Sequence, residues 1–326
     1  MNKINFKLAF KMLVALLSIW LLIHASLLQF SLLINLIHHP ILLLAIFILF
    51  LIMVGINAWR WHKLNSAQNI VLGWLKTSWI TYISTGFNNV LPGNIGGDII
   101  RTYFLFKIAP QQKSKVVLSV MFDRMIGLMG IFTIICIIAI FQLRLFNQDE
   151  NLFYILLFCA IFCMAGLSIF LLSILLPKKI GITTWLNVNF PNKSWATSVV
   201  TFLEAIRAYR NAKFIILECL SFSILIQLCM TITIILIAKM MDFPPIHPLD
   251  YLIAIGVTQL ANLIPTAPGG LGIGEAAFSN TILLLNPSIP AAYATIFLAY
   301  RIIGVLVYLP GIFESTVRHA FGFKRN

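Results

Sequence analysis

Charged residues are scarce in this chain of 326 residues: Asp, Glu, Lys and Arg make up 10% of it, and hydrophobic residues make up 60%. A globular enzyme needs far more charge on its surface, so the composition excludes one and predicts an integral membrane protein. Acidic residues are rarest, and the net charge is +13. The basic residues cluster in alternate loops, as the positive-inside rule describes for the cytoplasmic loops of membrane proteins. This pattern explains the positive charge and argues against nucleic-acid binding.

The chain also lacks the usual patterns of metal, cofactor and catalytic sites. All five cysteines fall within apolar runs, and the histidines show no metal spacing apart from the adjacent pair His38 and His39. The run from Gly269 to Gly274 does not fit the dinucleotide-binding spacing, and no nucleophile lies in a pattern with a base. We therefore expect no cofactor, no metal and no catalytic residues, and we do not expect an enzyme.

What the chain has instead is long apolar runs. A helix needs about 20 residues to cross the ~30 Å hydrocarbon core of a bilayer. Two other stretches are broken by proline and glycine. In the first stretch, the helix after the break is too short to cross the bilayer. In the second stretch, the arms on both sides of the break are too short. The sequence therefore predicts an all-α polytopic membrane protein with about six full spans and two broken re-entrant hairpins. The predicted spans are 13–28, 41–59, 116–143, 152–176, 214–240 and 291–313, and the broken stretches are 70–108 and 251–285. The short helix after the first break is predicted from Ile99 to Ile108, and the two arms of the second stretch are predicted to have about 14 and 13 residues.

Two short motifs occur twice in the same order. NVLPGNIGG at 89–97 matches NLIPTAPGG at 262–270, and RMIGL at 124–128 matches RIIGV at 301–305. Each half then reads span, span, broken hairpin, span, and the two halves start on opposite sides of the membrane. We expect one membrane domain, 1–326, made of an inverted repeat with halves of about 1–150 and 151–326.

The distribution of basic residues sets the expected orientation. Arg60 and Lys63 follow the second span and are assigned to a cytoplasmic loop, as are the basic residues at both ends of the chain. Both termini are therefore expected in the cytoplasm of a bacterial cell, with the protein in the inner membrane. The first hairpin is expected to enter from the cytoplasm and the second from outside.

Several charged residues lie within or beside the repeated motifs, where burial in hydrocarbon is costly without a partner or water. Two interpretations stay open. In the structural one, Arg124 and Arg301 cap hairpin carbonyls or pair with Asp98 or Glu275. In the functional one, the arginines hold an anionic headgroup and a carboxylate acts as a gate or proton carrier. The glycines at the breaks either present N–H groups to a phosphate or allow close helix packing.

Three motifs together resemble a known family: N-x-x-P-x-x-x-G-G-D-x-x-R at 89–101, D-R-x-x-G at 123–127 and P-x-x-P-G-G-L-G-x-G-E-A at 265–276. They look like the transmembrane region of lysylphosphatidylglycerol synthases, which also occurs in stand-alone flippase-like proteins. In two-domain members the membrane region is implicated in moving aminoacylated phospholipid between leaflets, and a separate soluble domain transfers the aminoacyl group. The sequence stops at Asn326 without that domain. The resemblance implies function at Asp98, Arg101, Arg124, Gly269, Gly270, Glu275 and Arg301.

We therefore expect a flippase-like protein that binds and translocates a lipid headgroup between leaflets. The expected ligand is an anionic or aminoacylated phospholipid, or a lipid-linked phosphate. A membrane subunit or embedded transferase of lipid or lipid-linked glycan synthesis and a solute transporter are the alternatives, and a separately encoded lipid-modifying enzyme and a homo-oligomer stay open. The predicted binding residues are Asn89, Pro92, Gly96, Gly97, Asp98, Arg101, Asp123, Arg124, Pro268, Gly269, Gly270, Gly272, Glu275 and Arg301.

Overall fold

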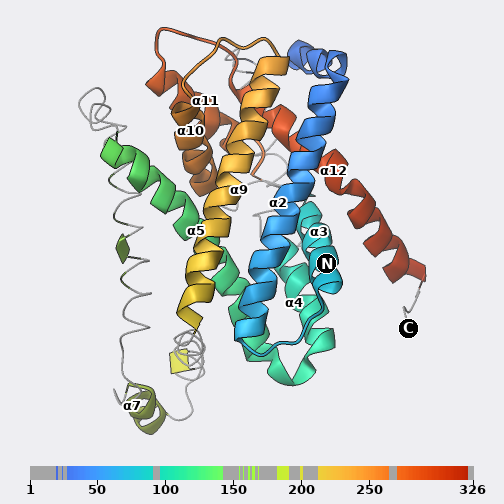
Figure 1. Cartoon of the computed structure of the whole chain (residues 1–326), viewed down its shortest axis with the longest axis vertical. Helices are drawn as coiled ribbons and strands as arrows, with labels where there is room; N and C mark the ends of the chain where they lie inside the picture. The colour runs from blue at the N-terminus through green and yellow to red at the C-terminus, as the bar shows by residue number, and fades with distance from the viewer. Residues whose placement is uncertain are drawn as a thin grey trace.

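The computed structural model describes residues 28–90, 96–141, 182–190, 199–200, 212–263 and 270–321, with a few single positions near 20–24 and 154–168. Within these residues the fold is entirely helical and contains no strand (Figure 1). The predicted all-α class is confirmed.

Among the residues that the structure describes, four helices are long and apolar enough to cross a membrane. They have 28 or 29 residues each, and at 1.5 Å per residue about 42 Å of helix exceeds the ~30 Å hydrocarbon core. They correspond to the predicted second, third, fifth and sixth spans, whereas the predicted first and fourth spans lie almost wholly outside the described residues. The four helices are α2 (Pro40–Ala67), α5 (Lys113–Phe141), α9 (Lys213–Met240) and α12 (Ala294–Phe321).

The two broken stretches form pairs of shorter helices. The first pair is α3 (Trp74–Val90) with α4 (Gly96–Ile108), and the second is α10 (Pro248–Ala261) with α11 (Ile273–Leu285). The arms of each pair pack against each other. Helix α4 begins at the two glycines and not at Ile99 as predicted, but at 13 residues it still measures only about 20 Å. The arms of the second pair have the predicted 14 and 13 residues. Shorter elements are η1 (Phe30–His38), η2 (Pro110–Gln112) and α7 (Ile182–Asn189).

The contacts between helices occur in equivalent sets. Helix α2 packs on α3, and α4 packs on α5, as α9 packs on α10 and α11 on α12. Between the halves, α3 packs on α12 and α10 packs on α5. Helices α2 and α9 lie along each other in opposite directions, with α3 and α4 near one end and α10 and α11 near the other (Figure 1). This is the arrangement of an inverted repeat; the halves 1–150 and 151–326 stay a prediction.

The second arm of each pair has glycine at or just before its first residue and an acidic side chain in its first turn. Asp98 lies in the first turn of α4, and Glu275 lies in the first turn of α11. A carboxylate is favourable there because the exposed N–H groups and the helix dipole make the end positive. Glu275 Oε2 accepts a hydrogen bond of 2.7 Å from the Gly272 N–H, and Gly272 has a φ of 85°, which an L side chain rarely adopts.

Polar side chains on the first arms bond to their own helices. Thr85 Oγ1 donates to the Thr81 carbonyl at 2.8 Å, and Thr258 Oγ1 donates to the Ala254 carbonyl at 2.6 Å. Bonds to the carbonyl four residues earlier satisfy a hydroxyl without water. The arms can therefore carry polar groups at membrane depth.

Candidate functional site

A buried ion pair joins α11 to α12. Arg301 Nε lies 2.9 Å from Glu275 Oε1, and the side chains are 10% and 1% exposed. Arg301 Nη2 also donates to Asn262 Oδ1 at 3.0 Å and to the Gly270 carbonyl at 3.1 Å. One guanidinium thus ties α12 to the first arm, the turn and the second arm of the hairpin. The predicted pairing with Glu275 and the predicted carbonyl cap are both present.

Glycine makes room for this guanidinium. A Cβ on Gly274 would collide with Arg301 Nη2 and would lie 2.7 Å from Asn262 Oδ1. Gly270 has a φ of 74°, and a Cβ there would collide with the same Asn262 oxygen. The guanidinium also lies over the Phe297 ring, 5.0 Å from its centroid. These glycines serve close packing around the arginine.

The first half contains the equivalent ion pair. Arg124 Nε lies 2.7 Å from Asp98 Oδ2, so α5 is joined to the first turn of α4 as α12 is joined to α11. In both pairs the arginine follows its carboxylate by 26 residues, from 98 to 124 and from 275 to 301. The exposures differ: the Arg124 and Asp98 side chains are 33% and 21% exposed. The two pairs are equivalent in position but only the second is buried.

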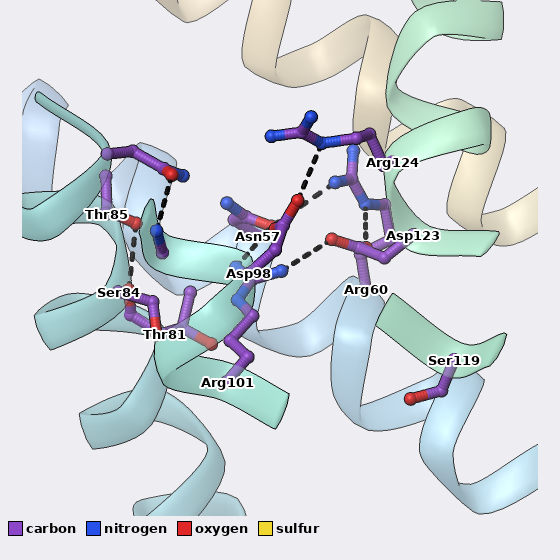
Figure 2. A network of polar contacts seen from close by, with 12 residues as sticks. Asn57, Arg60, Thr81, Ser84, Thr85, Asp98, Arg101, Ser119, Asp123 and Arg124 are labelled. Atoms are coloured by element: carbon purple, nitrogen blue, oxygen red, sulfur yellow. Dashed lines mark hydrogen bonds and ion pairs between the residues drawn. The ribbon is translucent and has the colours of Figure 1, made fainter. Parts of the chain in front are cut away.

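A second network surrounds Asp123 (Figure 2). Its Oδ1 accepts from Arg60 Nε and its Oδ2 from Arg101 Nη1, both at 2.7 Å. Asn57 Oδ1 accepts from both arginines at 3.3 and 3.4 Å, and Arg60 Nη1 donates to Ser223 Oγ at 2.8 Å. All three charged side chains are buried, so α2, α4, α5 and α9 meet at one carboxylate shared by two arginines.

This network corrects the assignment of Arg60. The sequence places it in a basic cytoplasmic loop after a span ending at 59, whereas α2 continues to Ala67 and buries Arg60. Lys63, one turn later, is half-exposed and pairs with Glu218 at 3.1 Å. The charge rule counts both residues equally and cannot distinguish a loop arginine from one that neutralises a buried acid in a neighbouring span.

The turn ends of both first arms reach one polar cavity. Two adjoining hollows of about 250 and 280 Å³ are both lined by Asn89 at the end of α3 and by Asn262 at the end of α10. Arg301 lines the first hollow and Arg124 the second. The cavity therefore lies between the two ion pairs. Its other polar lining residues are Asn57, Thr85, Asn88, Gln227, Gln259, Tyr300 and Tyr308.

The charged residues that line the two hollows are arginines. Arg301 lines the first hollow and Arg124 the second, and none of the carboxylates of Asp98, Asp123 and Glu275 lines either hollow. A guanidinium donates hydrogen bonds to phosphate and carboxylate oxygens, so this lining favours an anion. Across the described part of the chain, no three His, Cys, Asp or Glu side chains gather as metal ligands would.

Residues 8–311 match the family described as the lysylphosphatidylglycerol synthase TM region. The chain belongs to this family. No curated protein and no solved structure matched it. Membership agrees with the four apolar spans and establishes a multi-pass membrane protein related to lipid metabolism.

Of the remaining predicted residues of this family member, Asn89 lines the cavity, Gly96 and Gly97 do not line it, and the others lie outside the described residues. Asn89 lines the cavity and donates to the Thr85 carbonyl at 3.0 Å. Gly96 and Gly97 are buried, and the Gly97 N–H is donated to Asn88 Oδ1 at 2.7 Å, so this N–H is used within the hairpin. Pro92, Pro268 and Gly269 lie outside the described residues.

Sequence reasoning missed most of the neutral polar lining. Asn57, Gln227, Gln259 and Tyr300 were not predicted, although Gln227 and Gln259 bond to each other at 2.7 Å across α9 and α10. Each is a single amide or hydroxyl within a long apolar run. A useful signal was available: a Gln or Asn in the middle of a spanning helix needs a polar partner.

Proposed function

We propose that this protein binds the anionic headgroup of a membrane phospholipid in the polar cavity and translocates the lipid between leaflets. The observation that carries the proposal is the meeting of two oppositely placed hairpins at one cavity, with an equivalent arginine–carboxylate pair on each side. Family membership supports a role with lipids. The charged side chains that line the cavity, Arg124 and Arg301, favour a phosphate over a cation.

The arrangement provides a different function for each group. Arg124 and Arg301 line the cavity and carry donors suited to phosphate oxygens. Their carboxylates compensate the arginines when no anion is bound. The amides of Asn89, Asn262 and Gln259 supply neutral hydrogen bonds to the rest of a headgroup.

Transfer between leaflets follows from the inverted arrangement. One hairpin lies near each end of α2 and α9, so equivalent movements of the two hairpins would open the cavity to opposite sides. Aminoacyl transfer is not part of the proposal, because the arginines and amides that line the cavity suit binding of a headgroup. We place the protein in a bacterial inner membrane with both termini in the cytoplasm, and a separately encoded lipid-modifying enzyme as its partner.

The test is translocation of a fluorescent phospholipid in proteoliposomes, read by quenching of the outer leaflet with dithionite. Labelled phosphatidylglycerol is compared with labelled phosphatidylcholine. We expect the protein to accelerate transfer of the anionic lipid, and the pair of changes Glu275→Gln and Arg301→Ala to slow it by about tenfold or more, because a charge-assisted hydrogen bond contributes roughly 1.5–3 kcal/mol.

Lys63→Gln is the matched control, because it removes a cation whose ion pair is half-exposed and does not line the cavity. Transfer that is unchanged in the double variant, or equally fast for both lipids, contradicts the proposal. Uptake of a water-soluble anion with no lipid transfer would indicate a solute transporter instead.

A further inference from the structure

A separate hollow of about 510 Å³ lies between α4 and α5. Its lining is mainly apolar, with Ile99, Tyr103 and Phe106 from α4 and Val117, Val120 and Met121 from α5. Several of these side chains are exposed on the outside of the bundle, including Ile99 and Met121. We call this hollow the α4–α5 groove. From Asp98 to Phe106 it follows α4 for about 12 Å at the helical rise.

The groove and the polar cavity share Arg124. This residue lines the α4–α5 groove and also the hollow that contains Asn89 and Asn262. Its partner Asp98 lines the groove as well. The Asp98–Arg124 pair thus lies where an apolar surface passes into a polar one. The partial exposure of this pair, compared with the buried Glu275–Arg301 pair, is explained by its position beside the groove.

A ligand that fills both spaces must be amphipathic. The apolar groove suits a hydrocarbon chain, and Arg124 at its inner end suits an anionic group. A second cation lies on α4: the Lys107 ammonium is 4.5 Å from the centroid of the Tyr103 ring, which lines the groove. Cations at the groove favour a negatively charged lipid over a zwitterionic one.

We propose that the α4–α5 groove holds one acyl chain of an anionic phospholipid whose phosphate lies at Arg124. The Asp98–Arg124 pair then separates the groove from the polar cavity, and the phosphate competes with Asp98 for the guanidinium as the headgroup passes inward. This inference rests on the proposed function and assigns the lateral path that the lipid takes. The occupant is a phospholipid of the surrounding bilayer.

The direct test places a photoreactive benzophenone amino acid in position 121 or 137 of the full chain, reconstituted in vesicles of equal phosphatidylglycerol and phosphatidylcholine. Met121 lines the groove, whereas Ile137 lies on the same helix with a similar exposure, 45% against 48%, and does not line it. After illumination, mass spectrometry identifies the lipid adducts. We expect adducts at position 121 to be enriched in phosphatidylglycerol and adducts at position 137 to follow the bilayer composition.

Arg124→Gln should abolish the enrichment at position 121, because it removes the proposed phosphate partner and leaves the apolar lining unchanged. Equal adduct compositions at positions 121 and 137 overturn the proposal, and so does enrichment that persists in Arg124→Gln. Adducts dominated by free fatty acid also overturn it, because the occupant would then lack a phosphate. Retained elution as a single species on size exclusion verifies that each variant is folded.

Translocation assays separate this inference from the proposed function. Met121→Trp fills the groove and should slow lipid transfer, whereas Ile137→Trp should not. If wild-type protein transfers lipid and Met121→Trp does so equally fast, the groove proposal fails and the proposed function stands. If the adducts at position 121 are enriched in anionic lipid but neither the wild-type protein nor a variant transfers this lipid, the groove proposal is supported and the translocation proposal fails.

Discussion

Glu275 and Asp98 occupy equivalent positions 177 residues apart, and their partners Arg301 and Arg124 are separated by the same interval. Each carboxylate lies in the first turn of a short helix and binds an arginine of the following span. The equivalence extends from sequence spacing to atomic contact. It makes the two pairs internal controls for each other, because the same chemical change can be made in a buried and in a half-exposed setting.

The first prediction compares these two settings. Glu275→Ala leaves the buried Arg301 without its carboxylate and should cost about 3–5 kcal/mol of stability. Asp98→Ala should cost only about 1 kcal/mol, because Arg124 can reach water. Thermal unfolding in detergent, followed by intrinsic tryptophan fluorescence, compares the loss of stability in the two variants. Equal losses in the two variants would contradict the difference in burial.

The second prediction concerns the carboxylate shared by two arginines. Asp123→Asn keeps the shape of the side chain but removes the charge opposite Arg60 and Arg101, so it should destabilise the protein by about 3–5 kcal/mol. Glu218→Gln, in the half-exposed pair with Lys63, should cost at most about 1 kcal/mol. Denaturation in mixed micelles compares them. An Asp123→Asn variant as stable as Glu218→Gln would show that the arginines find other partners.

The third prediction uses three glycines in helices. Gly97→Ala should destabilise the first hairpin, because the added Cβ would collide with the Ser84 carbonyl and the Asn88 side chain, and overpacking typically costs about 1–3 kcal/mol. Gly274→Ala should act similarly against Arg301. Gly55→Ala should be neutral or stabilising by up to about 1 kcal/mol, because nothing lies within 4 Å of its added Cβ. Yield and thermal unfolding of the three variants test this order.

The fourth prediction concerns water and charge in the cavity. Gln259→Cys should react with a membrane-impermeant methanethiosulfonate, and an anionic reagent should react faster than a cationic one because the charged side chains that line the cavity are Arg124 and Arg301. The Ser279 side chain on α11 is fully buried and does not line the cavity, so Ser279→Cys should stay unmodified. Mass spectrometry of the labelled protein measures both reactions. Faster reaction with the cationic reagent would contradict a positively charged lining.

The sequence predicted where the helices lie because their signals are local and strong, but it ended α2 and α12 eight residues early, at 59 and 313. Long apolar runs specify spans, and proline with glycine specifies breaks, so α9 and both arms of the second hairpin lie where predicted to within a few residues. The start of α4 was placed three residues late. Glycine is unfavourable in a helix interior, so the prediction excluded Gly96 and Gly97 from α4. Both lie in its first turn, where close contact with α3, and not helix propensity, determines which residue is present.

The candidate site was predictable only where a motif or a charge interrupts the apolar pattern. The pairing of Arg301 with Glu275 was one of the open interpretations because both residues lie in repeated or glycine-rich motifs. The trio of Arg60, Asp123 and Arg101 was not found, because its members come from three helices and depend on how those helices pack. Neutral lining residues such as Gln227 carry no charge to mark them.

The turn of the second hairpin is longer, and the position of its extra residues has a consequence for engineering. The asparagines of the repeated motifs are 173 residues apart, from 89 to 262, whereas the acids and arginines are 177 apart. Four residues were therefore accommodated between the asparagine and the acid, and none between the acid and the arginine. One residue added to α11 after Glu275 would rotate the carboxylate by about 100° relative to the rest of the helix and away from α12. Insertions should thus be rejected within α11 after Glu275, because they would separate the carboxylate from Arg301.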